Sequence, residues 1–180
     1  MADIAIRAGC AADIGRLLDI ERSAAALLLE HGAHDLFAMH SLSADDLQRG
    51  IDSRMLTVAE VGSQAVGFAL CGEVDGQAYL FEMDVLPEVG RRGIGSALLE
   101  SVCAQAGARG CATISLVTLR NVPWNAPFYA ARGFYELPIS RHGPQLAQLI
   151  AHEQMLGFPM QLRVVMQRGV QSAAPLPTAP

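Results

Sequence analysis

The segment from Glu82 to Glu100 carries the residues whose types and spacing most clearly indicate chemistry. An apolar strand breaks at Pro87, passes through the glycine-rich turn Gly90–Gly95 and continues as a helix. Glycines let the backbone approach a ligand closely, and the free N–H groups of a first helical turn attract anionic oxygen. Arg91 and Arg92 add positive charge at the same place. The segment therefore predicts a phosphate-binding turn, with an ordinary strand-to-helix turn bearing solvated arginines as the alternative.

The spacing excludes two common nucleotide-binding motifs, because the turn lacks the Lys-Ser/Thr of a P-loop and the glycine pattern of dinucleotide-binding folds. It resembles the acyl-CoA pyrophosphate loop of the GNAT superfamily of N-acetyltransferases, whose pattern is Arg/Gln-x-x-Gly-x-Gly/Ala. Gly93 and Gly95 occupy the two small positions, whereas Gly90 replaces the usual Arg or Gln. The resemblance implies that the backbone N–H groups from Arg91 through Ser96 bind the diphosphate of acetyl-CoA, with weakened rather than abolished affinity.

A second stretch resembles another GNAT signature, Asn…Phe-Tyr-x-x-x-Gly-Phe. Phe128-Tyr129 and Gly133-Phe134 fall in register, but the asparagine position holds Val122, so that Asn121 or Asn125 must substitute. The resemblance implies a short helix on which Tyr129 is the general acid for the departing thiolate. A tyrosine that only packs on the cofactor is the alternative. The cofactor contacts that the resemblance implies are Met83, Asp84, Val85, Arg91, Arg92, Gly93, Ile94, Gly95, Ser96, Asn125 and Phe128.

The general base is less well defined by the sequence. Glu82 and Asp84 lie on the same face of a regular strand, and Glu82 is the expected catalytic base, acting directly or through water. The alternative is a carboxylate that only attracts the acceptor ammonium. Asp84 could instead be a solvated acid. The rivals are His142, His152 and Glu153, which lie in a segment inserted before the last strand, each of them otherwise expected on a solvated face or loop. Trp124 either lines the acceptor pocket or fills the core, and the core is favoured.

Hydrophobic periodicity and turn residues place these groups on a regular series of elements. The expected strands cover residues 4–7, 55–61, 65–70, 78–85, 112–118, a segment from 133, and 163–167; the expected helices cover 14–30, 43–53, 95–107, a short segment around Tyr129, and part of 143–157. This order implies the GNAT fold of α/β (α+β) class. In that fold a mixed, mostly antiparallel sheet of about seven strands is flanked by helices, here with an extra helix before the last strand. We expect one domain over residues 1–170 and a disordered Pro/Ala-rich tail over 171–180.

Composition narrows the class of protein further. The net charge of −5 argues against nucleic acid as a partner, and the apolar runs are too short to cross a membrane. The N-terminus has no signal pattern, so a cytoplasmic location is expected. The four cysteines, Cys10, Cys71, Cys103 and Cys111, are expected to be reduced and buried. His31, His34 and His40 invite a metal-site interpretation, but their spacing favours a mobile polar loop without metal.

The resemblance to the GNAT superfamily implies an N-acetyltransferase that moves an acetyl group from acetyl-CoA to a primary amine through a ternary complex. A small-molecule acceptor is favoured, because residues 31–46 and 140–160 would cover the acceptor cleft against a long peptide. A protein N-terminus or lysine remains an alternative, as does a non-catalytic acyl-CoA sensor that kept the fold. A homodimer is expected from the resemblance alone.

Overall fold

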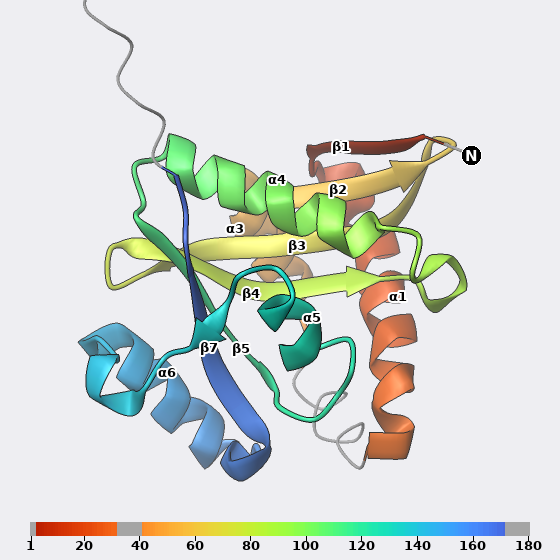
Figure 1. Ribbon diagram of the computed structural model, residues 1–180. Coiled ribbons are helices and arrows are strands. Elements are labelled where there is room, and N and C mark those ends of the chain that lie inside the picture. Colours follow the sequence, from red (N-terminus) through yellow and green to blue (C-terminus); the bar gives the residue numbers. More distant parts are fainter. Residues whose placement is uncertain (1–2, 32–40, 172–180) are drawn as a thin grey trace, which may run out of the picture.

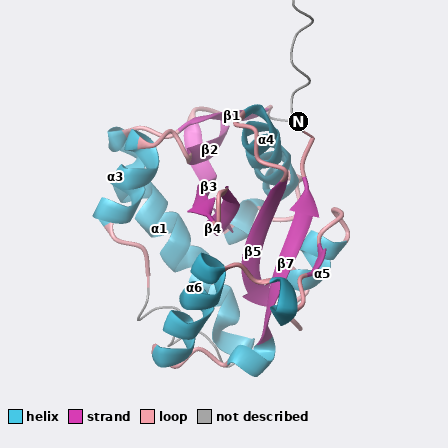
Figure 2. Cartoon of the chain, turned by 90° about the vertical axis from the view of Figure 1, so that its left-hand side faces the viewer, coloured by secondary structure: helices cyan, strands magenta, loops and turns pink. Residues whose placement is uncertain are grey.

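The fold is a seven-stranded sheet with helices on both faces, seen in a computed structural model that describes residues 3–31 and 41–171. The strand order is β1-β2-β3-β4-β5-β7-β6. Helices α1, α3 and α6 cover one face, and α4 and α5 cover the other (Figures 1 and 2). In chain order the strands are β1 (Ile4–Ala8), β2 (Leu56–Val61), β3 (Gln64–Val74), β4 (Gln77–Val85), β5 (Thr113–Leu119), β6 (Tyr135–Glu136) and β7 (Arg163–Gly169). The α-helices are α1 (Ile14–Ala25), α3 (Ala44–Asp52), α4 (Ile94–Ala108), α5 (Ala126–Ala130) and α6 (Pro144–Met155). The 3-10 turns are η1 (Ala11–Asp13), η2 (Ala26–His31), η3 (Pro87–Val89), η4 (Ile139–Arg141) and η5 (Met160–Leu162).

Two tight hairpins build the antiparallel half of the sheet. Gly62 and Ser63 join β2 to β3, and Asp75 and Gly76 join β3 to β4. All four residues have positive φ, between 52° and 69°. Two successive positive-φ residues match the right-handed twist of the flanking strands, and Gly and Asp are among the residues that adopt this conformation most readily. The three strands therefore pair in sequence and lead directly into the predicted phosphate turn.

Local side-chain contacts fix the helices on the first face. Ser43 caps α3 by accepting a hydrogen bond from the Asp46 N–H, while the Asp46 carboxylate accepts one from the Ser43 N–H. Ahead of α1, Asp13 accepts hydrogen bonds from the Arg7 guanidinium at 2.7 and 2.8 Å. The bonds to Arg7 hold the pKa of Asp13 at about 2, although its burial acts in the opposite direction. Arg7 also binds Glu60 of β2, so one cation joins β1, β2 and the start of α1.

The core lies in layers on the two sides of the sheet. Leu98, Leu99 and Val102 of α4 pack against the sheet on one side, whereas Leu17 and Ile20 of α1 pack on the other. A smaller apolar cluster holds α6 against the sheet, and it consists of Val74, Tyr79, Leu137, Leu146 and Val165. The sheet is therefore covered on both faces.

The inserted helix α6 is attached to the β3–β4 turn rather than to the cleft. The Asp75 carboxylate accepts hydrogen bonds from the N–H groups of Gln145 and Leu146 at 2.9 and 3.0 Å, and the Gln145 side chain accepts one from the Asp75 N–H at 2.6 Å. Asp75 thus caps a helix about 70 positions away in the chain. The expectation that residues 140–160 cover an acceptor cleft is wrong for α6, because no residue between Pro144 and Met155 lines the cleft described below.

Other expectations need correction or lie outside the described residues. Cys10 is exposed and Cys71 and Cys111 are partly exposed, so that only Cys103 of the four is buried. The strand after Gly133 is reduced to two residues. Within residues 3–31 and 41–171, no helix is long and apolar enough to cross a membrane, and no cluster of metal-ligating side chains occurs. The predicted tail from residue 172 and the histidines at 34 and 40 are not among the described residues, nor is the His31 side chain.

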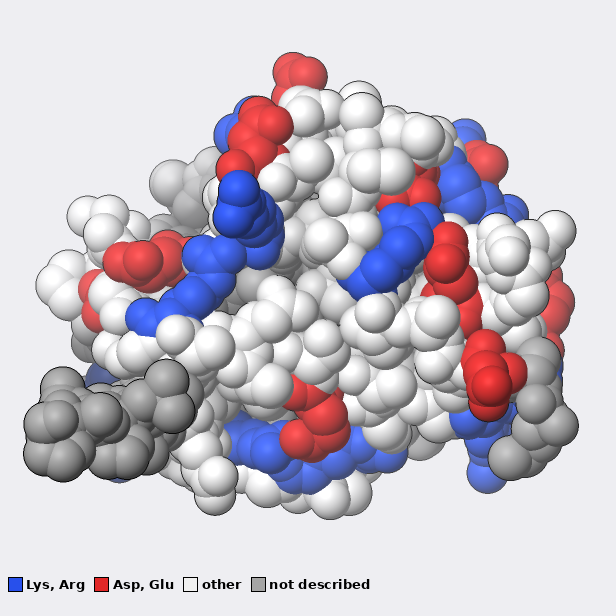
Figure 3. Space-filling model, turned by 90° about the horizontal axis from the view of Figure 1, so that it is seen from above, with Lys and Arg blue, Asp and Glu red and all other residues white. Residues whose placement is uncertain are grey.

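The surface seen from above carries no single charged patch. Figure 3 shows Arg side chains interspersed with Asp and Glu over this face.

Candidate active site

The site begins where β4 and β5 separate. These parallel strands pair at only two positions, Ala78 with Ile114 and Tyr79 with Ser115. Beyond them β5 continues to pair with β7, and β4 with β3. The gap belongs to a cleft of about 1430 Å³ that is lined by residues of β4, β5, α1, α4 and α5. Main-chain groups along the open edge of β4 are thus available to a ligand.

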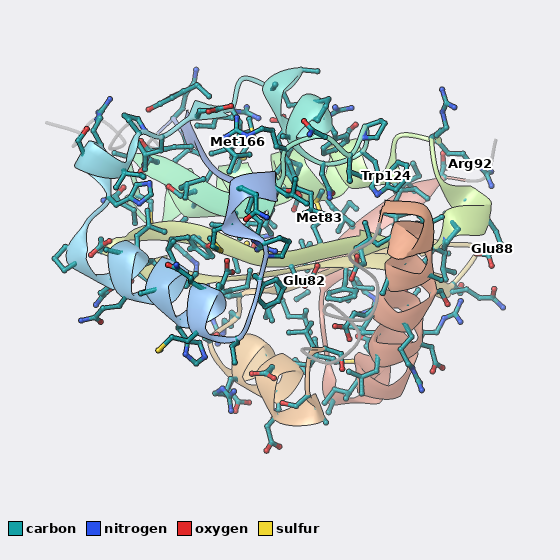
Figure 4. All side chains as sticks on the ribbon, turned by 90° about the horizontal axis from the view of Figure 1, so that it is seen from below. Glu82, Met83, Glu88, Arg92, Trp124 and Met166 are labelled. Atoms are coloured by element: carbon teal, nitrogen blue, oxygen red, sulfur yellow. The ribbon has the colours of Figure 1, made fainter. Side chains whose placement is uncertain are left out.

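A β-bulge decides which β4 side chains enter the cleft. Leu70 of β3 lies opposite Glu82 whereas Cys71 lies opposite Leu80, so Phe81 is the extra residue. Ahead of the bulge Leu80 packs toward α4, and after it Met83 and Val85 do so. Glu82 and Asp84 consequently share the opposite face, as predicted, but on a bulged strand rather than a regular one. Figure 4 shows Glu82 and Met83 on opposite sides of β4.

The main chain of β4 alternates between its two neighbours. The Leu86 N–H donates to the Val66 carbonyl of β3 at 2.8 Å, and the Asp84 carbonyl lies against Gly67 of the same strand. In an antiparallel ladder alternate residues point their hydrogen-bonding groups to opposite edges. The N–H and C=O groups of Met83 and Val85 therefore face the gap. Asp84 contributes its side chain to the cleft and not its main chain.

The N-terminus of α4 presents a row of open donors at the other end of the cleft. Within residues 3–31 and 41–171, the backbone N–H groups of residues 91–96 find no acceptor, and the first bond of the helix runs from the Ala97 N–H to the Gly93 carbonyl. Gly93, Ile94, Gly95 and Ser96 line the cleft. Six unsatisfied N–H groups at a helix N-terminus form an anion-binding site. The residues present therefore fit a diphosphate.

The glycines of this turn have distinct roles. Gly93 has φ of +88°, a left-handed conformation that strains other residues, and Arg91 also has a positive φ of 60°. A Cβ on Gly95 would lie 3.5 Å from the Phe128 ring, so any longer side chain would enter the cleft. A Cβ on Gly90 would lie 3.1 Å from the Pro87 carbonyl oxygen. A side chain at Gly90 would therefore require the turn after Pro87 to shift by a few tenths of an ångström.

Tyr129 of α5 lies in the same cleft and is nine-tenths buried. Its ring packs edge-on against Phe128 and Phe134 at centroid distances of 5.2 and 5.5 Å. Its hydroxyl makes no hydrogen bond to any residue that the structure describes. Burial raises the pKa of Tyr129 far above its usual value, and the charges of Glu82 and Asp84 act in the same direction. The phenol consequently stays protonated and can serve only as a proton donor at neutral pH.

Comparison with known proteins identifies the arrangement. Residues 52–136 match the family model of the acetyltransferase (GNAT) domain. This part of the chain is similar to a GNAT acetyltransferase domain. The matched span covers β2 to β6 and so includes the open donors of α4, the bulged β4 and Tyr129.

Solved GNAT structures share the fold at low sequence identity. The chain is similar to PaiA N-acetyltransferase from Thermoplasma acidophilum in complex with coenzyme A, with 17% identity, a TM-score of 0.70, and 93% of this chain and 99% of that chain covered. It is similar to the ribosomal-protein-S18-alanine N-acetyltransferase from Escherichia coli, with 18% identity, a TM-score of 0.67, and coverage of 98% and 100%. A third similar structure is N-acetylglutamate synthase from Neisseria gonorrhoeae with coenzyme A and N-acetyl-glutamate, with 15% identity, a TM-score of 0.70, and coverage of 95% and 36%.

Some residues of the two GNAT-like signatures line the cleft and others do not. Asn125 lines the cleft at the start of α5, whereas Asn121 is exposed outside it, and Val122 is buried. Arg91 lines the cleft, but Arg92 does not and points away from the sheet (Figure 4). Of the cofactor contacts expected from the resemblance, all but Arg92 line the cleft.

Sequence reasoning missed Arg132, which lies beside the α4 N-terminus. Its Nε and Nη2 atoms donate to the Ser96 hydroxyl at 3.1 and 2.6 Å, and Nη1 donates to the Phe128 carbonyl at 2.9 Å. The guanidinium stacks 3.7 Å from the Phe128 ring centroid and lines the cleft. A guanidinium carries five N–H groups, so some donors of Arg132 remain available to an anion. The only sequence signal was its place between Tyr129 and Gly133, which the GNAT pattern leaves undefined.

Three carboxylates meet in the other half of the GNAT cleft. They come from Glu82 and Asp84 of β4 and from Glu21 of α1, which is held by a 2.7 Å hydrogen bond from the Leu42 N–H. Burial, aided by the Glu21 charge, raises the pKa of Glu82 to about 7. Burial and the charges of Glu82 and Glu21 also raise the pKa of Asp84 well above its usual value. A base with a pKa near 7 is suited to work at neutral pH.

The rival bases lie outside the cleft. His142 contacts the Leu137 carbonyl at 3.2 Å, and His152 is exposed on α6. Glu153 is bound to Arg163 at 3.1 Å in a largely buried ion pair. None of the three lines the cleft. Trp124 does line it and is 44% exposed, so the expectation that Trp124 fills the core is wrong.

Proposed function

We propose that the protein is an N-acetyltransferase that moves an acetyl group from acetyl-CoA to the primary amine of a small molecule by direct transfer in a ternary complex. The observation that carries this proposal is the row of unpaired N–H groups from residue 91 to 96. These donors open into the cleft that also contains Tyr129 and the unpaired edge of β4. A diphosphate bound there leaves the thioester arm of acetyl-CoA to follow β4 toward Tyr129.

The open edge of β4 supplies the groups that orient the thioester. Met83 and Val85 offer both donors and acceptors to the amide-containing arm of the substrate. A main-chain N–H of this strand also stabilises the negative oxygen that develops when the amine attacks the carbonyl carbon. Because strand main chain is held rigidly by β3, these donors need no rearrangement during the reaction.

The remaining chemistry is proton transfer. Ionised Glu82 takes a proton from the acceptor ammonium, directly or through water, and frees the nitrogen lone pair for attack. As the C–N bond forms, the carbonyl electron pair moves to oxygen; its return breaks the C–S bond. The Tyr129 hydroxyl donates its proton to the departing sulfur, and the second proton released by nitrogen restores the phenol. The products are the acetylated amine and the free thiol of coenzyme A.

The proposal is tested by following thiol release from acetyl-CoA with a panel of amines, a peptide with a free N-terminus and a lysine-containing peptide. Acetyl-CoA binding is measured separately by calorimetry. Turnover with a small amine supports the proposal, whereas faster turnover with a peptide would move the acceptor to proteins. Binding of acetyl-CoA without turnover on any acceptor would make the protein a sensor.

A further inference from the structure

Three large apolar side chains that line the cleft are partly open to solvent. Leu27, Phe81 and Trp124 are 41%, 46% and 44% exposed. They come from η2, from the bulge of β4 and from the segment before α5, and all three line the cleft. Large apolar side chains in a concave site favour a ligand with apolar surface.

The same cleft also contains three acidic side chains, which are Glu21, Glu82 and Asp84. The nine-tenths buried Tyr129 hydroxyl, which has no partner among the described residues, opens into it as well. These polar groups fix where the reacting nitrogen must lie, because the amine has to reach both a base and the thioester carbon. The exposed apolar side chains of the cleft are then available to the rest of the acceptor molecule.

The cations on this side of the cleft are already engaged. Arg22 is paired with Asp19 on the same helix. Arg163 is bound by Glu153 and stacks 4.8 Å from the Phe158 ring centroid, with only 7% of its side chain exposed. A carboxylate on the acceptor would therefore meet apolar surface and three acids. Burying an unpaired charge there is costly, and the same holds for a second ammonium against Leu27, Phe81 and Trp124.

We infer that the acceptor is a primary amine carried on an apolar, uncharged body, an alkyl or arylalkyl amine, with its nitrogen at Glu82 and its body against Leu27, Phe81 and Trp124. This inference rests on the proposed acetyltransferase function and narrows its substrate class.

The test compares three acceptors of equal length that differ only at the far end: hexylamine, hexane-1,6-diamine and 6-aminohexanoate. At saturating acetyl-CoA we expect kcat/KM for hexylamine to exceed that for the other two by about tenfold or more. Trp124→Ala should reduce kcat/KM for hexylamine by about tenfold and leave the diamine less affected. Met155→Ala is the matched control, because this side chain is 78% exposed but does not line the cleft.

Each outcome decides between this inference and the underlying function. Equal rates for the three acceptors, or a preference for the diamine or the amino acid, would overturn the acceptor class while the acetyltransferase function stands. No turnover of any amine despite acetyl-CoA binding would overturn both. If Trp124→Ala loses its cooperative thermal transition, Leu27→Ala replaces it, with the same selective loss for hexylamine expected.

Discussion

The two halves of the cleft are built in different ways. The half expected to hold the diphosphate consists of main-chain N–H groups from one short run, residues 91–96. The acceptor half consists of side chains from α1, η2, β4 and the segment before α5. A contiguous backbone site tolerates side-chain changes as long as its conformation persists. A site assembled from separate elements changes with each residue, which explains how one fold can serve many acceptors.

The two halves also differ in electrostatics. Open N–H groups, Arg91 and Arg132 favour anions at one end, whereas three carboxylates favour a cation at the other. In the proposed ternary complex Tyr129 lies between the two substrates, at the junction of the two halves. Substitutions at the junction should therefore affect turnover, and substitutions at either end should affect the binding of one substrate.

The largest effect is expected for Tyr129→Phe, at the junction. This variant should reduce kcat by about 10²-fold or more, because the thiolate would leave without a proton donor. The acetyl-CoA dissociation constant should stay nearly unchanged, as calorimetry can measure. A loss of affinity as large as the loss of turnover would contradict a role as acid and indicate packing on the cofactor.

Glu82→Gln should reduce kcat/KM by about 10²-fold and should also alter its pH dependence. Only ionised Glu82 can accept a proton, so wild-type kcat/KM should rise with pH and level off above its pKa of about 7. A second pH-dependent change in kcat/KM, at higher pH, would report the ionisation of the acceptor amine. The limb near 7 should vanish in the Gln variant; if it persists there, another group is the base, and Asp84→Asn becomes the next variant to measure.

Arg132→Gln tests the diphosphate half. The variant should raise KM for acetyl-CoA by about tenfold, the effect of losing one hydrogen bond to a charged group, with kcat nearly constant. Arg141→Gln makes the same charge change at an exposed residue outside the cleft and should leave KM unchanged. An equal rise in KM for both variants would show that the overall charge, and not a contact made by Arg132, causes the effect.

The smallest effect is expected outside both halves, at the cap of α6. Asp75→Ala removes the acceptors for the Gln145 and Leu146 N–H groups, which should cost about 1 kcal/mol of unfolding free energy and lower Tm by about 2–4 °C. Circular dichroism during heating measures the shift. Turnover should not change, and a change in acceptor preference would mean that α6 influences the cleft after all.

The sequence predicted the fold and the glycine-rich turn before α4 well because both depend on local patterns. The alternation in β2 to β4, the turns at Gly62 and Asp75, and the glycines before α4 each act within a few residues. Arg132 and Glu21 could not be found in this way, because their roles come from α5 and α1 folding against a distant turn and strand. Trp124 was assigned to the core for the same reason, since aromatic residues are usually buried and only the tertiary arrangement leaves this one in the cleft.

The bulge at Phe81 has a consequence for how this chain can vary. In a regular strand that kept Phe81 but lacked the bulge, Met83 and Val85 would face the acceptor, and two carboxylates would be pressed into the hydrocarbon layer under α4. Deleting the single codon for Phe81 would instead remove the bulge and leave every later residue of β4 on its present side. A chain shorter by this one residue could thus keep the chemistry of the site, whereas the full-length chain depends on the bulge.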